Sequence, residues 1–184
     1  MATLATKADT SWTQKWFREQ YEPWFQEARP LIEQHQYGAA FKTYPFPAFD
    51  QSPWSPVQIP LSAARLGIVS TAGLYRRDVD LPFADTSEGD PRVIELPRHL
   101  DSRTLACGHS HIPHDLIQAD VNVVLPLDPL QALVQEGRLG EIAPRIFSLI
   151  GYRTRADEVA AETAPRIAAA MEEDGVTLGL VIPV

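Results

Sequence analysis

The spacing of hydrophobic positions changes once along the chain. Between residues 11 and 38 large apolar side chains recur at roughly helical spacing, which predicts amphipathic helix: Trp12, Trp16, Phe17, Phe25, Leu31 and Ile32. Pro23 and Pro30 interrupt this stretch. We expect them to divide it into short helices, because proline lacks the amide hydrogen that an inner helical turn uses.

A proline-rich segment, residues 44–60, follows the helical pattern. Proline fixes φ and removes a hydrogen-bond donor, so this segment is predicted to be an extended linker. The sequence thus predicts two parts: an N-terminal helical arm with its linker, residues 1–60, and an α/β domain, residues 61–184. The arm either caps the domain or packs against a second subunit, because tryptophan and phenylalanine bury large areas at interfaces.

Short apolar runs alternate with amphipathic stretches after the linker. Three runs predict strands: 65–70, 92–96 and 176–184. The last run is continuously apolar, which is typical of a strand buried on both faces of a sheet. Two stretches predict helices that end at a glycine: 128–136 before Gly137, and 156–173 before Gly175. This order favours an α/β fold with a mostly parallel sheet flanked by helices.

Composition narrows the classes of function. The net charge is -8 and the pI is near 5.0, which argues against a nucleic-acid partner, because such proteins usually present a basic surface. The mean hydropathy is -0.16, and no apolar stretch approaches the length of a membrane span. The first ten residues lack the apolar core of a secretion signal, and one cysteine excludes an intrachain disulfide. We expect a cytoplasmic protein.

Titratable side chains are concentrated in one segment. Four of the five histidines lie within 16 residues, beside Cys107: His99, His109, His111 and His114. Histidine can act as an acid or base near neutral pH, or bind a metal. Three interpretations stay open for His109, His111 and His114: acid–base or substrate-anchoring residues, ligands of zinc or another divalent metal, or parts of a purely structural loop.

Cys107 also has two interpretations. A free cysteine is often a small buried hydrophobic residue. The neighbouring histidines favour a reactive thiol, because a nearby imidazolium lowers a thiol pKa. The candidate catalytic residues are therefore Cys107, His109, His111 and His114.

Candidate substrate-binding residues follow the predicted strands. Ser70, Thr71 and Gly73 offer hydroxyl and backbone N–H groups after the first strand, although an ordinary turn would look the same. Asp90 and Arg92 either form a local ion pair in a turn or face the site. Asp120 and Asn122 complete the predicted set.

Seven short motifs follow one another along the second part of the chain: 66–74, 82–83, 89–92, 109–111, 120–128, 137–144 and 151–152. Taken in order, they resemble the glycine/sarcosine/betaine reductase selenoprotein B family, which is related to a D-proline reductase subunit. The resemblance covers residues 66–184.

The resemblance implies an α/β fold and reductive chemistry on a small molecule. A selenocysteine or cysteine would attack the substrate, and a dithiol or thioredoxin-type donor would regenerate it. In this family the last strand runs into the segment that carries the selenocysteine or cysteine. We therefore expect a selenocysteine codon after Val184, in preference to a chain cut there or a short homologue without the redox motif.

The leading hypothesis is a reductase-family protein that forms a homo-oligomer through its N-terminal helices. Its pocket would lie at the carboxyl ends of the strands, and its nucleophile would be a selenol or thiol. Two alternatives remain: a metal-dependent enzyme that uses the histidine cluster, and a non-catalytic scaffold subunit.

Overall fold

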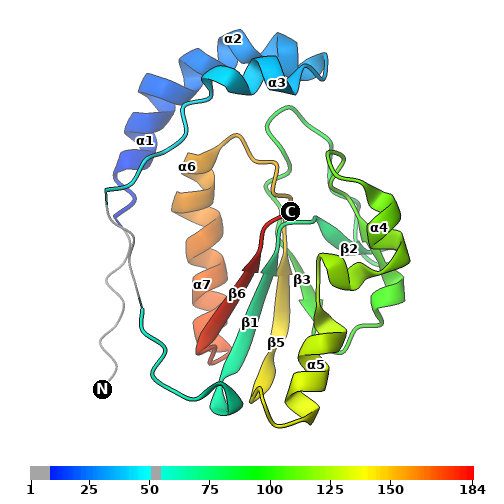
Figure 1. The fold of residues 1–184 in the computed structure, drawn as a ribbon. Helices are drawn as coiled ribbons and strands as arrows, with labels where there is room; N and C mark the ends of the chain where they lie inside the picture. The colour runs from blue at the N-terminus through cyan, green and yellow to red at the C-terminus, as the bar shows by residue number, and fades with distance from the viewer. Residues whose placement is uncertain (1–8, 51–54) are drawn as a thin grey trace. The chain divides into compact units, whose positions relative to one another are not determined.

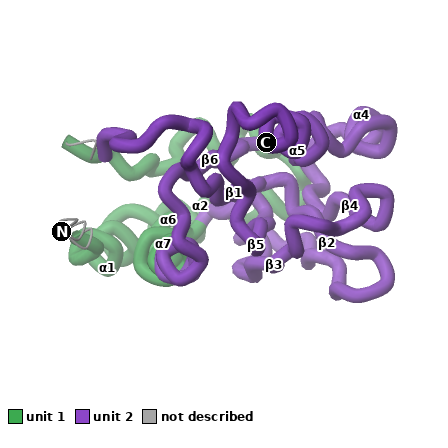
Figure 2. Tube along the Cα trace, turned by 90° about the horizontal axis from the view of Figure 1, so that it is seen from below, with its two compact units in different colours: residues 1–51, 155–165 green, residues 52–154, 166–184 purple. Residues whose placement is uncertain are grey.

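A computed structural model describes residues 9–50 and 55–184. The chain divides into two compact units, which are coloured separately in Figure 2. The first unit combines residues 1–51 with residues 155–165, and the second combines residues 52–154 with residues 166–184. Residues 155–165 thus join the N-terminal arm although they are distant from it in sequence.

The first unit is built on a helix without a break from Trp12 to Glu33. Its three consecutive parts are α1 (Trp12–Trp16), the π-helical turn η1 (Phe17–Tyr21) and α2 (Glu22–Glu33). The prediction that Pro23 and Pro30 separate short helices is wrong. The π-helical turn ends at Tyr21, two residues before Pro23, which stands in the first turn of α2, where a proline is tolerated. Pro30 lies inside α2, where packing of the buried helix face outweighs the lost hydrogen bond.

An aromatic core holds this unit together. The indole of Trp24 donates a hydrogen bond to the carbonyl of Ala40 over 3.1 Å, which ties α2 to α3 (Tyr37–Ala40) and the following 3-10 turn η2 (Phe41–Thr43). The guanidinium of Arg155 lies 4.1 Å from the ring centroid of Phe17. Arg155 precedes α6 (Ala156–Glu158) and the π-helical turn η6 (Val159–Thr163), so this cation–π contact joins the late segment to the arm.

The second unit contains a four-stranded sheet with the order β3-β5-β1-β6 (Figure 1). Strands β1 (Arg65–Ser70), β5 (Glu141–Ser148) and β6 (Leu178–Ile182) run parallel, and β3 (Ile94–Pro97) pairs antiparallel with β5. The predicted mostly parallel α/β fold is confirmed.

Strand β6 lies at the edge of this sheet, so the prediction that it is buried on both faces is wrong. It pairs with β1 alone, and its Val181 side chain is 64% exposed. An apolar run indicates membership of a sheet, but it does not report how many neighbours the strand has.

Helices cover opposite faces of the sheet (Figure 1). Helix α5 (Leu127–Gln135) packs on the face that carries Ile68 and Ile146, and α7 (Ala164–Glu173) packs on the face that carries Phe147. The chain therefore leaves the adjacent strands β1 and β5 towards opposite faces. In open α/β sheets, ligands bind outside the carboxyl ends of two such strands.

A small antiparallel ribbon lies beside the main sheet. It consists of β2 (Leu74–Arg76) and β4 (Leu105–Cys107), with Leu74 opposite Cys107. The remaining elements of this unit are short: η3 (Leu61–Ala63), η4 (Ser102–Thr104), α4 (His114–Ala119) and η5 (Val121–Val123). No helix in residues 9–50 or 55–184 is long and apolar enough to cross a membrane.

Candidate functional site

The segment that carries the histidines is fastened to the carboxyl ends of the central strands. The thiol of Cys107 donates to the carbonyl oxygen of Ala72 over 3.0 Å, and the amide of Gly108 donates to the carbonyl oxygen of Gly73 over 2.8 Å. The amide of Gly73 in turn donates to the carbonyl oxygen of Leu149. The histidine segment is thus held beside the loops that follow β1 and β5.

His109 is buried within this loop, with 4% of its surface exposed. Its Nδ1 accepts a hydrogen bond of 3.3 Å from the backbone amide of His111, which places the proton of the neutral ring on Nε2. Burial lowers the pKa of His109, and the charges of His111 and His114 lower it further. His109 is therefore a neutral ring that stabilises the turn at neutral pH.

His111 is directed differently. Its ring stacks on Tyr152, with 4.4 Å between ring centroids, and is nearly perpendicular to the ring of His109. The residues between β4 and α4 form turns, so His109 and His111 do not share the face that an extended strand would give them. Within the described residues, no three His, Cys, Asp or Glu side chains are grouped so that they could hold a metal ion. The geometry does not support the three-histidine metal interpretation.

His114 begins α4 and lines a cleft together with Cys107. Its Nε2 lies 2.8 Å from the carbonyl oxygen of His109. A carbonyl only accepts, so Nε2 carries the proton and Nδ1 is left as the acceptor of the neutral ring. His114 can therefore take up or deliver a proton through Nδ1.

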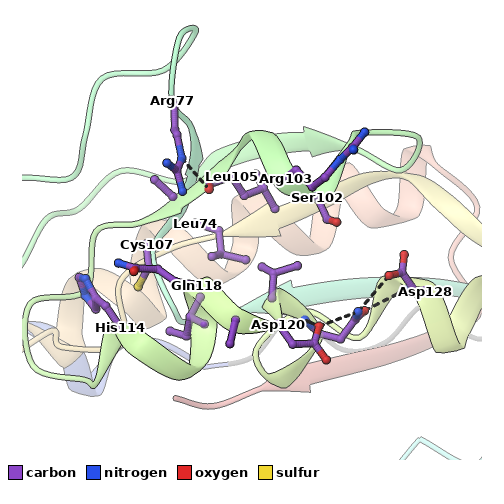
Figure 3. Close-up of a pocket in the computed structure, with 15 residues that line it drawn as sticks. Leu74, Arg77, Ser102, Arg103, Leu105, Cys107, His114, Gln118, Asp120 and Asp128 are labelled. Atoms are coloured by element: carbon purple, nitrogen blue, oxygen red, sulfur yellow. Dashed lines mark hydrogen bonds between the residues drawn. The ribbon is translucent and has the colours of Figure 1, made fainter.

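The cleft has a volume of about 340 Å³ and lies between the β2–β4 ribbon and the segment from α4 to the start of α5 (Figure 3). Cys107, His114 and Gln118 are drawn at one end of it, and Asp120 and Asp128 at the other. Apolar side chains contribute to its walls: Leu74, Leu105, Ile117 and Val121.

Two carboxylates share one amide at the acidic end of the cleft. The Nδ2 group of Asn122 donates to Asp120 over 2.9 Å and to Asp128 over 3.0 Å. The amide of Asp128 donates back to Oδ1 of Asn122 over 3.1 Å. In the part of the chain that the structure describes, neither carboxylate forms a salt bridge with a lysine or arginine. This end of the cleft is negatively charged.

Two arginines line the same cleft. Arg77 donates from Nε to the carbonyl oxygen of Leu105 over 3.0 Å, which directs its guanidinium along the ribbon. Arg103 pairs with Asp101 at the surface over 2.7 Å. The cleft therefore offers positive and negative groups at separate places.

Cys107 is half-buried at the other end from the carboxylates. Burial raises the pKa of its thiol, and a hydrogen bond from the backbone amide of His109 offsets only part of this effect. Together with the bond to the carbonyl of Ala72, burial keeps the sulfur protonated at neutral pH.

Alkylation of Cys107 should therefore need a more alkaline solution than an ordinary cysteine does. The thiolate is the reacting form, so a raised pKa moves the rate–pH curve to higher pH. Because the chain has one cysteine, intact-mass measurement of iodoacetamide labelling reports this thiol alone. The control is the same chain in denaturant, and a folded midpoint at or below the denatured one would show an activated thiol.

The polar groups of the remaining candidate residues form hydrogen bonds and ion pairs with other groups of the protein. The Ser70 hydroxyl donates to the carbonyl of Val124 over 2.8 Å, and Thr71 Oγ1 accepts from the amide of Val184 over 2.8 Å. Asp90 and Arg92 form a close pair of 2.6 Å, and Asp90 is buried.

Only some of the predicted site residues therefore line the cleft. Its lining includes Cys107, His114, Asp120 and Asn122. Seven other candidates lie outside the lining: Ser70, Thr71, Gly73, Asp90, Arg92, His109 and His111.

Sequence reasoning missed several residues of the cleft: Arg77, Ser102, Arg103, Gln118 and Asp128. A signal existed for Asp128, because it stands at the start of a predicted helix, shortly after Asp120 and Asn122. Arg77 follows the short strand β2, and Arg103 precedes the short strand β4. The hydrophobic pattern predicted neither strand, and nothing in the sequence distinguishes these two residues from other surface arginines.

Comparison with known proteins adds a family match. The model of the family described as glycine/sarcosine/betaine reductase selenoprotein B (GRDB) matches residues 28–182. The match begins within α2, earlier than the motifs that start at Leu66.

Several curated proteins are similar to this chain. The D-proline reductase subunit gamma of Acetoanaerobium sticklandii is 27% identical over 123 residues, which are 67% of this chain and 50% of that protein. The betaine reductase complex component B subunit beta of Peptoclostridium acidaminophilum is 29% identical over 169 residues, 89% of this chain and 38% of that protein. The chain therefore spans half or less of the length of these relatives. No solved structure matches it significantly.

Proposed function

Because this chain belongs to the glycine/sarcosine/betaine reductase selenoprotein B family, we propose that it forms part of a reductase that binds a small amine-bearing carboxylate in the cleft. The relatives are named for reductases of D-proline, sarcosine, betaine and glycine. Each of these small molecules carries a cationic nitrogen and a carboxylate. The separated charges of the cleft support the proposal.

The acidic end suits the nitrogen. Asp120 and Asp128 share the neutral amide of Asn122 and keep their negative charge available for a bound cation. Charge-assisted hydrogen bonds of this kind are roughly twice as strong as neutral ones. The substrate carboxylate would face Arg77 or Arg103, and about 340 Å³ falls in the usual range for small-molecule sites.

The reducing nucleophile is proposed to be a selenol or thiol other than Cys107. The Cys107 thiol is buried, donates to Ala72 and has a raised pKa, so little thiolate is present at neutral pH. Cys107 would then form the wall beside the reacting atoms. His114 lies at the same end of the cleft as Cys107 and would exchange a proton with the nucleophile through Nδ1.

Assembly with other subunits is part of the proposal. Three relatives are named as subunits of a reductase complex component. A dithiol or thioredoxin-type donor would supply the electrons that regenerate the nucleophile. The chain would contribute the binding cleft to such a complex.

Calorimetric titration of the 184-residue chain tests the cleft. Glycine, sarcosine, betaine and D-proline are compared with acetate and methylammonium, which carry one charge each. We expect the zwitterions to bind more tightly. Asp128→Asn should weaken the binding of glycine, sarcosine and D-proline, whose cationic nitrogens carry N–H groups, roughly 10-fold to 100-fold, because a hydrogen bond to a charged group contributes about 1.5–3 kcal/mol.

Asp78→Asn is the matched control, since Asp78 carries the same charge and lies outside the cleft lining. It should leave binding unchanged. Equal affinity for acetate and glycine, or equal effects of the two variants, would contradict the proposed site.

A further inference from the structure

The two edges of the main sheet are built differently. Strand β3 ends on Pro97 and carries the exposed charge of Glu95, two features that discourage pairing with another strand. Strand β6 has neither, because residues 176–182 contain no charged residue and no proline. Unprotected, uncharged edges are templates for strand pairing.

The outer part of β6 is also open. Val181 is 64% exposed, although it is a large apolar side chain. Two residues earlier, no atom lies within 4 Å of the position that a Cβ on Gly179 would take. One face of β6 thus presents an exposed apolar side chain at residue 181 and an empty space at residue 179.

We propose that β6 pairs antiparallel with β6 of a second copy of this chain, about a two-fold axis at Leu180. In that register residue 179 of each copy lies opposite residue 181 of the other. Each Val181 would then cover the space beside Gly179 of the other copy. The four-stranded sheet would continue across both copies as eight strands, within the usual size of open sheets.

Charge does not oppose a second copy at this edge. The chain has a net charge of -8, so most surfaces of two copies repel one another. Residues 175–184 carry no side-chain charge, so this edge can approach its own copy without bringing like charges directly opposite each other. This interface is independent of the proposed substrate cleft.

The oligomeric state provides the first test. Light scattering after size exclusion should show mass rising with concentration from 20.5 kDa towards twice that value. Val181→Lys should weaken dimer formation about tenfold or more, because it places two buried charges at the pairing edge. Val79→Lys adds the same charge at a residue that is 69% exposed outside β6, and should leave the dimer unchanged.

A cross-link tests the register. In the Cys107→Ala background, Leu180→Cys places two cysteines directly opposite each other, at a separation that suits a disulfide. We expect a disulfide-linked dimer under mild oxidation and none from Val79→Cys in the same background. A chain that stays monomeric would overturn the proposal. A dimer that tolerates Val181→Lys and forms no cross-link through the Leu180→Cys substitution would also overturn it. Such a dimer would instead favour an interface at the N-terminal arm.

Discussion

Replacement of Asp90 by alanine is expected to lower the free energy of unfolding by about 3 kcal/mol, because it removes a buried carboxylate that accepts hydrogen bonds from an arginine and from backbone amides. Asp90 accepts from the amide of Ala84 over 2.7 Å and from the Arg92 guanidinium over 2.6 Å. The substitution leaves both donors without this acceptor. Denaturant titration followed by circular dichroism measures the loss.

Acid titration checks the same pair. Burial raises the pKa of Asp90, but hydrogen bonds from Arg92 and from the amide of Ala84 outweigh it, so the pKa lies below its usual value. The folded state therefore binds this proton less readily than the unfolded state. The stabilisation is present above the unfolded pKa, near about 4, and is lost as the pH falls through the lower folded pKa. Asp90→Ala should remove this contribution to acid sensitivity.

Asp101→Ala is the matched control. Asp101 and Arg103 repeat the Asp-x-Arg spacing of Asp90 and Arg92, but the Arg103 side chain is 88% exposed. Solvent screens such a pair, so its loss should destabilise the protein far less. Similar losses for the two variants would show that burial of Asp90 is not the cause.

Replacement of Gly89 by alanine is expected to cost about 3 kcal/mol or more, through overpacking added to backbone strain. Gly89 has φ of +83°, and a Cβ there would lie 1.9 Å from the carbonyl oxygen of Tyr152. The obstacle is backbone, which cannot rotate away as a side chain can. We expect the Tyr152 loop to move, and thermal unfolding should report the destabilisation.

Gly137→Ala separates the clash from the strain. Gly137 has φ of +70°, but no atom lies within 4 Å of its Cβ position. Its substitution should cost only the left-handed conformation, about 1–2 kcal/mol. Equal losses of stability in the Gly89→Ala and Gly137→Ala variants would mean that the clash with Tyr152 contributes nothing to the destabilisation.

The turn that contains Gly89 and Asp90 also supports the carboxyl edge of the sheet. The hydroxyl of Tyr152 donates to the carbonyl of Ser87 over 3.3 Å, and the same ring stacks on His111. The turn that contains Gly89 and Asp90 therefore contacts the Tyr152 loop, and that loop contacts the histidine segment. Gly89→Ala should consequently disturb His111, which histidine NMR signals would reveal.

Much of the fold could be predicted because it follows from local pattern. The strand at 65–70 matches β1, and the helices predicted at 128–136 and 156–173 correspond to α5 and to the run from α6 to α7. Hydrophobic periodicity and glycine C-caps are local signals. The position of β6 in the sheet and the continuity of the helix across Pro23 depend on neighbours that are distant in sequence.

The site was harder to predict. The density of titratable groups predicted His109 and His111 as site residues. In the structure His109 is buried and His111 stacks on Tyr152, so neither ring belongs to the cleft lining. Arg77 comes to the cleft because β2 pairs with β4, a contact between segments about 30 residues apart in sequence. No property of residues near Arg77 encodes that pairing.

The amino-acid sequence by itself determined the α/β class, the principal helices and strands, the family and the segment that holds Cys107 and His114. Tertiary structure alone decided that Cys107, His114, Asp120 and Asn122 share a cleft with Arg77, Arg103 and Asp128. The physical reason is that side-chain periodicity and caps act within a few residues. The charge and volume of a cleft arise where strands and turns from separate parts of the chain pack together.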